Sequence, residues 1–574
     1  MLGISSMGCI HGKLRWAPLV CALAAGGCGS DEASGDLAYQ SGRGGADNLN
    51  ADPSGDGDGA GDFGSAMSPA DAGSPPEVEE AIEFEPPQAS ERFVFAANPD
   101  AGTVAVINAE TLHIQTLETG ERPTYLRTLA GTDDAIVLNV GSDDATVIRM
   151  EQDAAALSHL PVTEGANSIA VAPDGKHAVV FFEAARAPNS IGFMDFQTVT
   201  VLKLAQDDDQ STNVTVGYKP RAVFFREDSA RAYVVTDDGV SILDLADIDA
   251  SGPRIADNKV FAGGDPEDEN TDVSITPDGR YALARLVGDS LLRLLDLESG
   301  QTRMLDLADA FMASEADADA GMGDAGDVEV TDLDMAPDGS YAVAVLRNQS
   351  AVMRVALPGG FDDDTGIDTH VLTGELIGLV EPVPESSLVL AYTTASDQIE
   401  RLTVLDLDTG DARALDVHKA IKAVSMAPDG NTAVIVHKKL DGDPLAPGLS
   451  HDERTDRSHG YTVLHPQTGF GRLTTTSVAP GAFTVVVEAQ SLFLLLRSDA
   501  TGVREVHRVD LVTFTSPTPP IVLDSPPIAV GAVSTQQRVF VSQDHPEGRM
   551  TFIDWTTSES LTVTGYELNA KVKD

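Results

Sequence analysis

The residues best suited to chemistry are the histidines and acids between 437 and 459. His437, His451 and His459 could offer ring nitrogens to zinc or another divalent metal, and Asp452 could add a carboxylate. His451 and His459 stand eight residues apart in a stretch rich in Gly and Pro, a spacing that is not typical of metal ligands. We therefore interpret this stretch as a solvated surface loop and keep the four residues as candidate ligands.

The sequence lacks the motifs of the common hydrolase and nucleotide-binding classes. It contains no Gly-x-Ser-x-Gly, no His-Glu-x-x-His and no phosphate-binding loop. Its three cysteines all lie within the first 28 residues, which excludes a disulfide framework, a cysteine nucleophile and a cysteine-based zinc site from the rest. We predict no catalytic residue and no cofactor. Acidic clusters at 207–209, 317–327 and 362–364 are interpreted as solubility features, with weak calcium binding as the alternative.

The chain is strongly acidic. Its 574 residues include 90 acidic and 38 basic side chains, a formal net charge of −52. Such a surface repels nucleic-acid phosphates and anionic headgroups, so a nucleic-acid partner is not expected. The charge indicates high solubility, with a cation-rich working environment as the alternative.

The first 28 residues have the order of an export signal. A basic flank at 11–15 precedes an apolar stretch at 16–25 that is too short to span a bilayer as a helix. Two glycines then lead to Cys28, an arrangement that resembles a bacterial lipobox. The resemblance implies that Cys28 is lipidated. Because Gly29 stands where Asp often retains such proteins at the inner membrane, it also implies an outer-membrane address. The alternative is an ordinary cleaved signal in which Cys28 is incidental.

Residues 29–90 have the composition of a tether. They hold 14 acidic residues and one basic residue among Gly, Ala, Ser and Pro. Such a stretch cannot bury enough apolar surface to offset its ordering entropy, so we predict a disordered segment between the membrane and the body.

The body, residues 91–574, is repetitive. Pro-Asp-Gly occurs at 173–175, 277–279, 337–339 and 428–430, each time before a short apolar run. A second signature, a short apolar run ending in Asp and an apolar residue, follows at 241–245, 293–297, 403–407 and 551–555. With weaker copies we count ten units at a mean spacing of about 50 residues.

The runs are predicted to be strands buried on both faces. They are rich in Val, Ile, Leu, Phe and Tyr, and many are apolar at consecutive positions, as in Leu492–Leu496. The recurring Asp is interpreted as a turn former whose carboxylate accepts a backbone N–H. Each unit holds about four runs; in unit two they are 135–140, 145–150, 157–162 and 168–172. The expected fold is all-β: a β-propeller of about ten four-stranded units, preferably one large ring, with two smaller propellers as the alternative.

The paired signatures at 277–300 and 401–430 resemble the YVTN/lactonase-like and quinoprotein-dehydrogenase-like propeller repeats of bacteria. That family includes surface proteins, binding modules and some enzymes. We expect a lipid-anchored propeller of the cell envelope that binds a protein or a glycan as a scaffold. Two alternatives stay open: a lactonase-like or quinoprotein-like enzyme with a metal or quinone at the central channel, and a component of a periplasmic assembly.

Overall fold

The computed structural model describes Glu77 and residues 87–567, apart from 187–194, 207, 248–253, 263–270, 287–288 and 317–327. The predicted signal peptide, the lipidation at Cys28 and nearly all of the predicted tether therefore lie outside the described residues.

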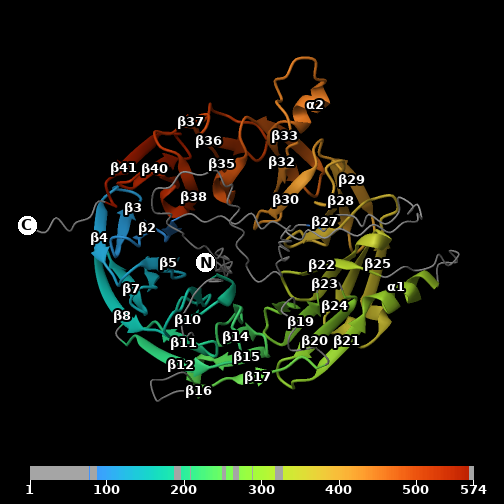
Figure 1. Ribbon diagram of the computed structural model, residues 1–574, viewed down its shortest axis with the longest axis horizontal. Coiled ribbons are helices and arrows are strands. Elements are labelled where there is room, and N and C mark those ends of the chain that lie inside the picture. Colours follow the sequence, from blue (N-terminus) through green and yellow to red (C-terminus); the bar gives the residue numbers. More distant parts are fainter. Residues whose placement is uncertain are drawn as a thin grey trace, which may run out of the picture.

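Ten sheets form the blades of one closed ring, and in each blade the chain runs from the axis to the rim (Figure 1). Blade one comprises β1 (Gln88–Ala89), β2 (Phe93–Asn98), β3 (Thr103–Asn108) and β4 (Ile114–Glu118), and blade two comprises β5 (Pro123–Thr128), β6 (Ala135–Asn139), β7 (Asp144–Glu151) and β8 (Ala154–Pro161). Blade three comprises β9 (Ser168–Val171), β10 (His177–Phe181), β11 (Thr198–Lys203) and β12 (Gln210–Thr215), and blade four comprises β13 (Ala222–Phe225), β14 (Arg231–Thr236), β15 (Gly239–Asp244) and β17 (Asp257–Lys259). Blade five comprises β18 (Thr271–Ile275), β19 (Tyr281–Leu286), β20 (Leu291–Asp296) and β21 (Thr302–Asp306).

Blade six comprises β22 (Val330–Met335), β23 (Tyr341–Leu346), β24 (Ala351–Ala356) and β25 (Ile367–Val371), and blade seven comprises β26 (Leu379–Pro382), β27 (Leu388–Tyr392), β28 (Arg401–Asp406) and β29 (Ala412–Asp416). Blade eight comprises β30 (Ile421–Met426), β31 (Ala433–His437), β32 (His459–His465) and β33 (Phe470–Thr476), and blade nine comprises β34 (Pro480–Val486), β35 (Ser491–Ser498), β36 (Val503–Asp510) and β37 (Ile521–Val522). Blade ten comprises β38 (Pro527–Val533), β39 (Arg538–Gln543), β40 (Arg549–Asp554) and β41 (Ser560–Thr564). Two α-helices, α1 (Leu307–Ala316) and α2 (His451–Asp456), lie in connections between strands.

One strand departs from the regular pattern. β16 (Arg254–Ile255) pairs in parallel with β12, the outermost strand of blade three, through Val214 and Arg254. Blade three therefore has a fifth strand, supplied by the chain on its way to β17 in blade four.

The prediction of one ring of ten four-stranded units is confirmed, but the predicted unit boundaries are wrong by one strand. The fourth run assigned to unit two, 168–172, contains β9, the innermost strand of blade three. The Pro-Asp-Gly turn joins the first and second strands of a blade, so units counted from that turn start one strand late. The ring also begins slightly earlier than residue 91, because β1 covers Gln88–Ala89.

The core consists of ten apolar clusters in the described chain, one at each seam between neighbouring blades. Alternate residues of one strand enter different clusters. In β35, Leu492, Leu494 and Leu496 pack toward blade eight, while Phe493 and Leu495 pack toward blade ten. Successive side chains of a strand point to opposite faces, so a strand with a blade on each side must be apolar at every position.

The glycine of each Pro-Asp-Gly turn has two roles. Gly339 and Gly430 have φ of +71° and +66°, the left-handed region that favours glycine. A Cβ at Gly339 would lie 2.5 Å from Cδ of Pro277, and one at Gly430 would lie 2.3 Å from the carbonyl oxygen of Pro384. Both contacts are with the preceding blade, so the repeated motif sets the spacing between blades as well as the turn.

The recurring Asp is a turn former, as predicted. Asp554 accepts the backbone N–H groups of Thr556 and Thr557 at 2.8 and 2.9 Å. Asp296 and Asp510 each accept the same pair of backbone N–H groups at the corresponding turns, and Asp406 accepts the N–H of Asp408.

These turns predict loss of stability in acid. The Thr556 hydroxyl and the backbone donors at 556 and 557 hold the pKa of Asp554 at about 2, below its ordinary value of 3.8. A carboxyl whose pKa is lower in the folded state stabilises the fold at any pH above its ordinary pKa. That stabilisation is lost as the pH falls through the folded-state pKa. The urea midpoint of the wild-type chain should therefore fall between about pH 4 and pH 2. Asp554→Asn keeps an acceptor oxygen without a titration and should show a shallower fall. Equal slopes for the two proteins would contradict this assignment.

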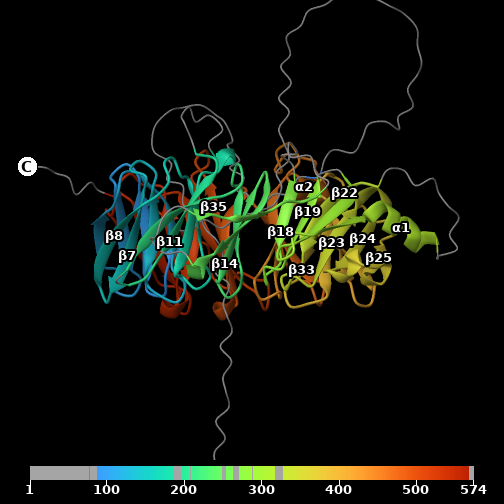
Figure 2. The same ribbon diagram turned by 90° about the horizontal axis from the view of Figure 1, so that it is seen from below.

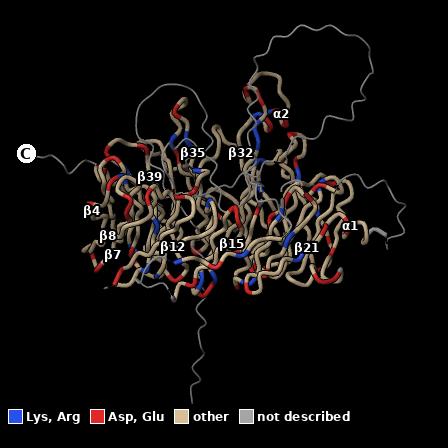
Figure 3. The backbone as a smooth tube through the Cα atoms, turned by 60° about the horizontal axis from the view of Figure 1, so that its bottom comes forward, with Lys and Arg blue, Asp and Glu red and all other residues tan. Residues whose placement is uncertain are grey.

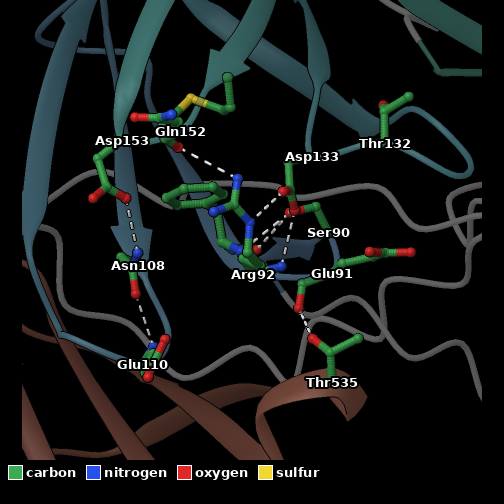
Figure 4. A network of polar contacts seen from close by, with 12 residues as sticks. Ser90, Glu91, Arg92, Asn108, Glu110, Thr132, Asp133, Gln152, Asp153 and Thr535 are labelled. Atoms are coloured by element: carbon green, nitrogen blue, oxygen red, sulfur yellow. Dashed lines mark hydrogen bonds and ion pairs between the residues drawn. The ribbon is translucent and has the colours of Figure 1, made fainter.

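Polar contacts reinforce the seams (Figure 4). Between blades one and two, Asp133 accepts the Arg92 guanidinium at 2.6 Å and the Ser90 hydroxyl at 2.9 Å. Between blades ten and one, the Thr535 hydroxyl donates to the carbonyl of Glu91 (Figure 4).

The ring closes without exchanging strands. β1 to β4 form blade one and β38 to β41 form blade ten, so neither end of the chain completes the sheet of the other. A buried cluster that includes Val94, Phe540 and Phe552 joins these two blades. Arg538 adds hydrogen bonds from its guanidinium to the carbonyls of Ala109 and Glu110.

The ring has two different faces. We call one face the loop face; it carries the connections between the second and third strands of each blade and those from one blade to the next. The opposite face, the turn face, carries the connections between the first and second strands, including the Pro-Asp-Gly turns, and those between the third and fourth strands. The long connections 182–197, 307–329 and 438–458 all belong to the loop face. α2 projects outward beyond the rim of the ring (Figure 1), and in the side view it lies toward the loop face (Figure 2). Among the described residues, no helix combines the length and apolarity needed to cross a membrane.

Candidate functional site on the loop face

The four candidate metal ligands all belong to blade eight. His437 ends β31, His451 and Asp452 begin α2, and His459 begins β32. In the described part of the chain, no three His, Cys, Asp or Glu side chains are grouped so that they could hold a metal ion.

The interpretation of this stretch as a solvated loop is wrong for His437. Its side chain is 3% exposed, and its Nε2 lies 2.8 Å from the Thr462 hydroxyl and its Nδ1 3.3 Å from the carbonyl of Ala420. Burial lowers the pKa of His437 to about 4, so the ring is neutral at physiological pH. The strand extends one residue beyond its apolar run, and His437 acts there as a core hydrogen-bonding group.

The insertion after His437 is anchored to the ring by a buried lysine. The Lys419 ammonium donates to the carbonyls of Thr455 and Asp456 at 2.7 and 3.1 Å, although Lys419 is only 1% exposed. A cation at these final carbonyls stabilises the end of α2. At the other end, Ser450 and Glu453 form a capping box. The projection is thus a fixed feature of the loop face.

The acidic clusters serve partly as ion-pair partners. Asp209 receives both terminal nitrogens of Arg149, at 2.6 and 2.7 Å, and Asp362 receives Arg303 at 3.3 Å. Residues 207 and 317–327 lie outside the described residues.

An aromatic cluster lies on the loop face where blade three meets blade four. Phe182 is buried, and its ring meets Phe196 edge-on with centroids 5.6 Å apart. Phe196 in turn contacts Tyr218 at 5.9 Å, and Tyr218 is 41% exposed. Two rings come from the connection between β10 and β11 and the third from the connection into blade four, and together they lead from the core to the surface. We call them the aromatic platform.

The platform is held in place and bordered by charged groups. The backbone N–H of Tyr218 donates to the Asp238 carboxylate at 2.6 Å, and its carbonyl accepts the N–H of Asp237 at 2.8 Å. The Lys219 ammonium lies 5.5 Å from the centre of the Tyr218 ring. Asp237 also pairs with Lys219 at 3.6 Å. An exposed ring thus stands on a rigid base beside carboxylates and an ammonium group.

No pattern in the sequence indicated this platform. Phe182 and Phe196 stand near the two ends of the connection between β10 and β11, Tyr218 stands in the connection into blade four, and only the fold brings the three rings together. Figure 3 shows acidic and basic residues distributed around the whole ring, so charge alone does not single out this region.

Known proteins are only distantly similar to this chain. No family model matches the chain, and no curated protein matches it. Among solved structures, Kuenenia stuttgartiensis hydrazine synthase is 16% identical over 57% of this chain and 94% of that chain, with a TM-score of 0.29. The dihydro-heme d1 dehydrogenase NirN is 14% identical over 64% and 72%, with a TM-score of 0.35. A eukaryotic initiation factor is 10% identical over 74% and 97%, with a TM-score of 0.43.

Proposed function

We propose that this protein is a lipid-anchored β-propeller of the bacterial cell envelope that binds a glycan through the loop face of its ring. The observation that carries the proposal is the aromatic platform, in which the exposed Tyr218 ring contacts the partly buried Phe196, and Phe196 contacts the buried Phe182. The YVTN-like repeats and the lipobox-like sequence at Cys28 support the envelope address.

The platform suits a saccharide for three physical reasons. Aromatic rings present a flat apolar surface at little entropic cost, and sugar rings have a face of C–H groups that packs on it. Asp237 and Asp238 border the ring with carboxylate oxygens that can accept hydrogen bonds from hydroxyls. The net charge of −52 disfavours acidic polymers, so the ligand we propose is a neutral or amino-sugar glycan.

Replacing Tyr218 with alanine should weaken glycan binding about tenfold, the equivalent of roughly 1.4 kcal/mol. Binding of neutral and amino-sugar oligosaccharides to the full chain would be measured by calorimetry. Tyr218→Phe should retain most of the affinity because the ring stays.

Phe470→Ala is the matched control for this test. Phe470 is 59% exposed and stacks on Phe514 at 5.5 Å, but the β32–β33 connection beside it belongs to the turn face. Equal affinities for the Tyr218 and Phe470 variants would contradict the proposal. Capture of an envelope protein that depends on Tyr218, without saccharide binding, would replace the glycan by a protein ligand.

A further inference from the structure

A carboxylate from the N-terminal region is buried in the seam between blades six and seven. The side chain of Glu77 is 4% exposed and contacts residues more than 250 positions away along the chain. Its partners, Arg347 between β23 and β24, Gly378 before β26, and Thr393 and Thr394 after β27, all lie on the loop face.

The seam surrounds this carboxylate with donors. Oε1 accepts the Thr393 hydroxyl at 2.7 Å and lies 3.4 Å from Nε of Arg347. Oε2 accepts the Thr394 N–H at 2.8 Å, the Thr394 hydroxyl at 3.0 Å and the Ala395 N–H at 3.0 Å. Hydrogen bonds to a charged acceptor are stronger than neutral ones, and this acceptor has donors on both oxygens.

Gly378 makes room for the carboxylate. A Cβ at Gly378 would lie 1.9 Å from Oε1 of Glu77 and 2.5 Å from its Cγ. The backbone of Gly378 does not have a positive φ, so its conformation does not require glycine. The close approach of the carboxylate is the feature that requires it.

The site is rigid because both blades are joined around it. The Asp332 carboxylate of blade six accepts the N–H of Val380 in blade seven at 2.7 Å, and the Thr331 hydroxyl donates to the carbonyl of Gly378 at 2.6 Å. Arg347 is 7% exposed. If Glu77 leaves, the hydroxyl and N–H donors at 393–395 lose a charged acceptor, and a second carboxylate in the same place would offset that loss.

We propose that this seam is a receptor site for a peptide carboxylate. Glu77 occupies it in cis, and an acidic peptide segment of a partner protein takes its place when Glu77 leaves. The site recognises a Glu side chain, because that is the group it holds now. This inference does not depend on glycan binding at the aromatic platform.

A labelled peptide in trans tests the proposal. The peptide covers residues 72–82, and its binding to the full-length wild-type chain and to Glu77→Ala is measured by fluorescence polarisation. The variant should bind at least tenfold more tightly, because a tethered Glu77 competes at an effective concentration of about millimolar. A peptide in which Gln replaces Glu77 should not bind. Equal binding to both proteins, or equal binding of both peptides, would overturn the proposal.

Two further variants locate the site. Gly378→Ala, added to Glu77→Ala, should abolish peptide binding by filling the space. Gly359→Ala is the control, because its Cβ would meet only the Cβ of Ala356 at 3.9 Å. If Glu77→Ala unfolds, Glu77→Gln keeps the side-chain shape and should still open the site to the peptide. Tyr218→Ala should leave peptide binding unchanged, so this test and the glycan test fail independently.

Discussion

Replacing Cys28 with serine should move the protein from the membrane fraction to the soluble fraction. If the lipobox-like sequence is processed as we propose, the Cys28 sulfur carries a diacylglyceryl group. Each buried CH₂ of an acyl chain contributes about 0.8 kcal/mol, and two chains are enough for stable anchoring. Serine has no thiol to accept the group, so the expected loss is nearly complete. Detergent-phase partitioning and incorporation of labelled palmitate would measure it.

The other two cysteines provide controls within the same segment. Cys9→Ser and Cys21→Ser should leave both the label and the membrane association unchanged, since these residues are not at the end of the apolar stretch. If Cys28→Ser still incorporates palmitate, Cys28 is not the lipidated residue and the envelope address must be argued from another feature.

Truncating Phe540 to alanine should destabilise the ring by about 3–5 kcal/mol, the usual cost of removing a fully buried phenylalanine. Phe540 is 0% exposed and lies in the cluster that joins blade ten to blade one. At every other seam the chain itself runs from one blade to the next, whereas this seam depends on side chains alone. We therefore expect opening to start here. Urea denaturation of the full chain would measure the loss.

Two variants separate closure from general packing. Leu561→Ala, in the same blade but 52% exposed, should change the free energy of unfolding by less than about 0.5 kcal/mol. Phe493→Ala removes the same side chain at the seam between blades nine and ten, where the chain itself runs from one blade to the next. Protease cleavage should be faster for the Phe540 variant than for the Phe493 variant, because only the Phe540 variant weakens the seam at which the ring can open. If the Phe540 and Leu561 variants are equally stable, this seam does not limit stability.

The sequence predicted the features that depend on local pattern. The unbroken apolar run at Leu492–Leu496 required blades on both sides, and the repeated Asp required a turn. The position of the blade boundary could not be found in this way, because the most visible motif, Pro-Asp-Gly, marks a turn within a blade. β16 was also missed, since a two-residue strand carries almost no pattern.

The candidate sites needed three-dimensional information. Glu77 and Arg347 meet only because the ring brings an N-terminal residue to the seam of blades six and seven. Gly378 looks like any loop glycine until the carboxylate beside it is seen. His437 shows the opposite case. Its sequence neighbours indicated a metal ligand, but both of its ring nitrogens make hydrogen bonds within the core.

Because each blade is a consecutive stretch of chain, apart from β16 of blade three, a duplication or deletion of one whole unit away from blades three and four would leave no half-built sheet behind. Rings that close by a shared strand cannot change size so simply, since their first and last segments must complete each other. The way this ring closes is therefore compatible with growth of the repeat array to ten blades by whole units, with only the last packing surface needing to adapt.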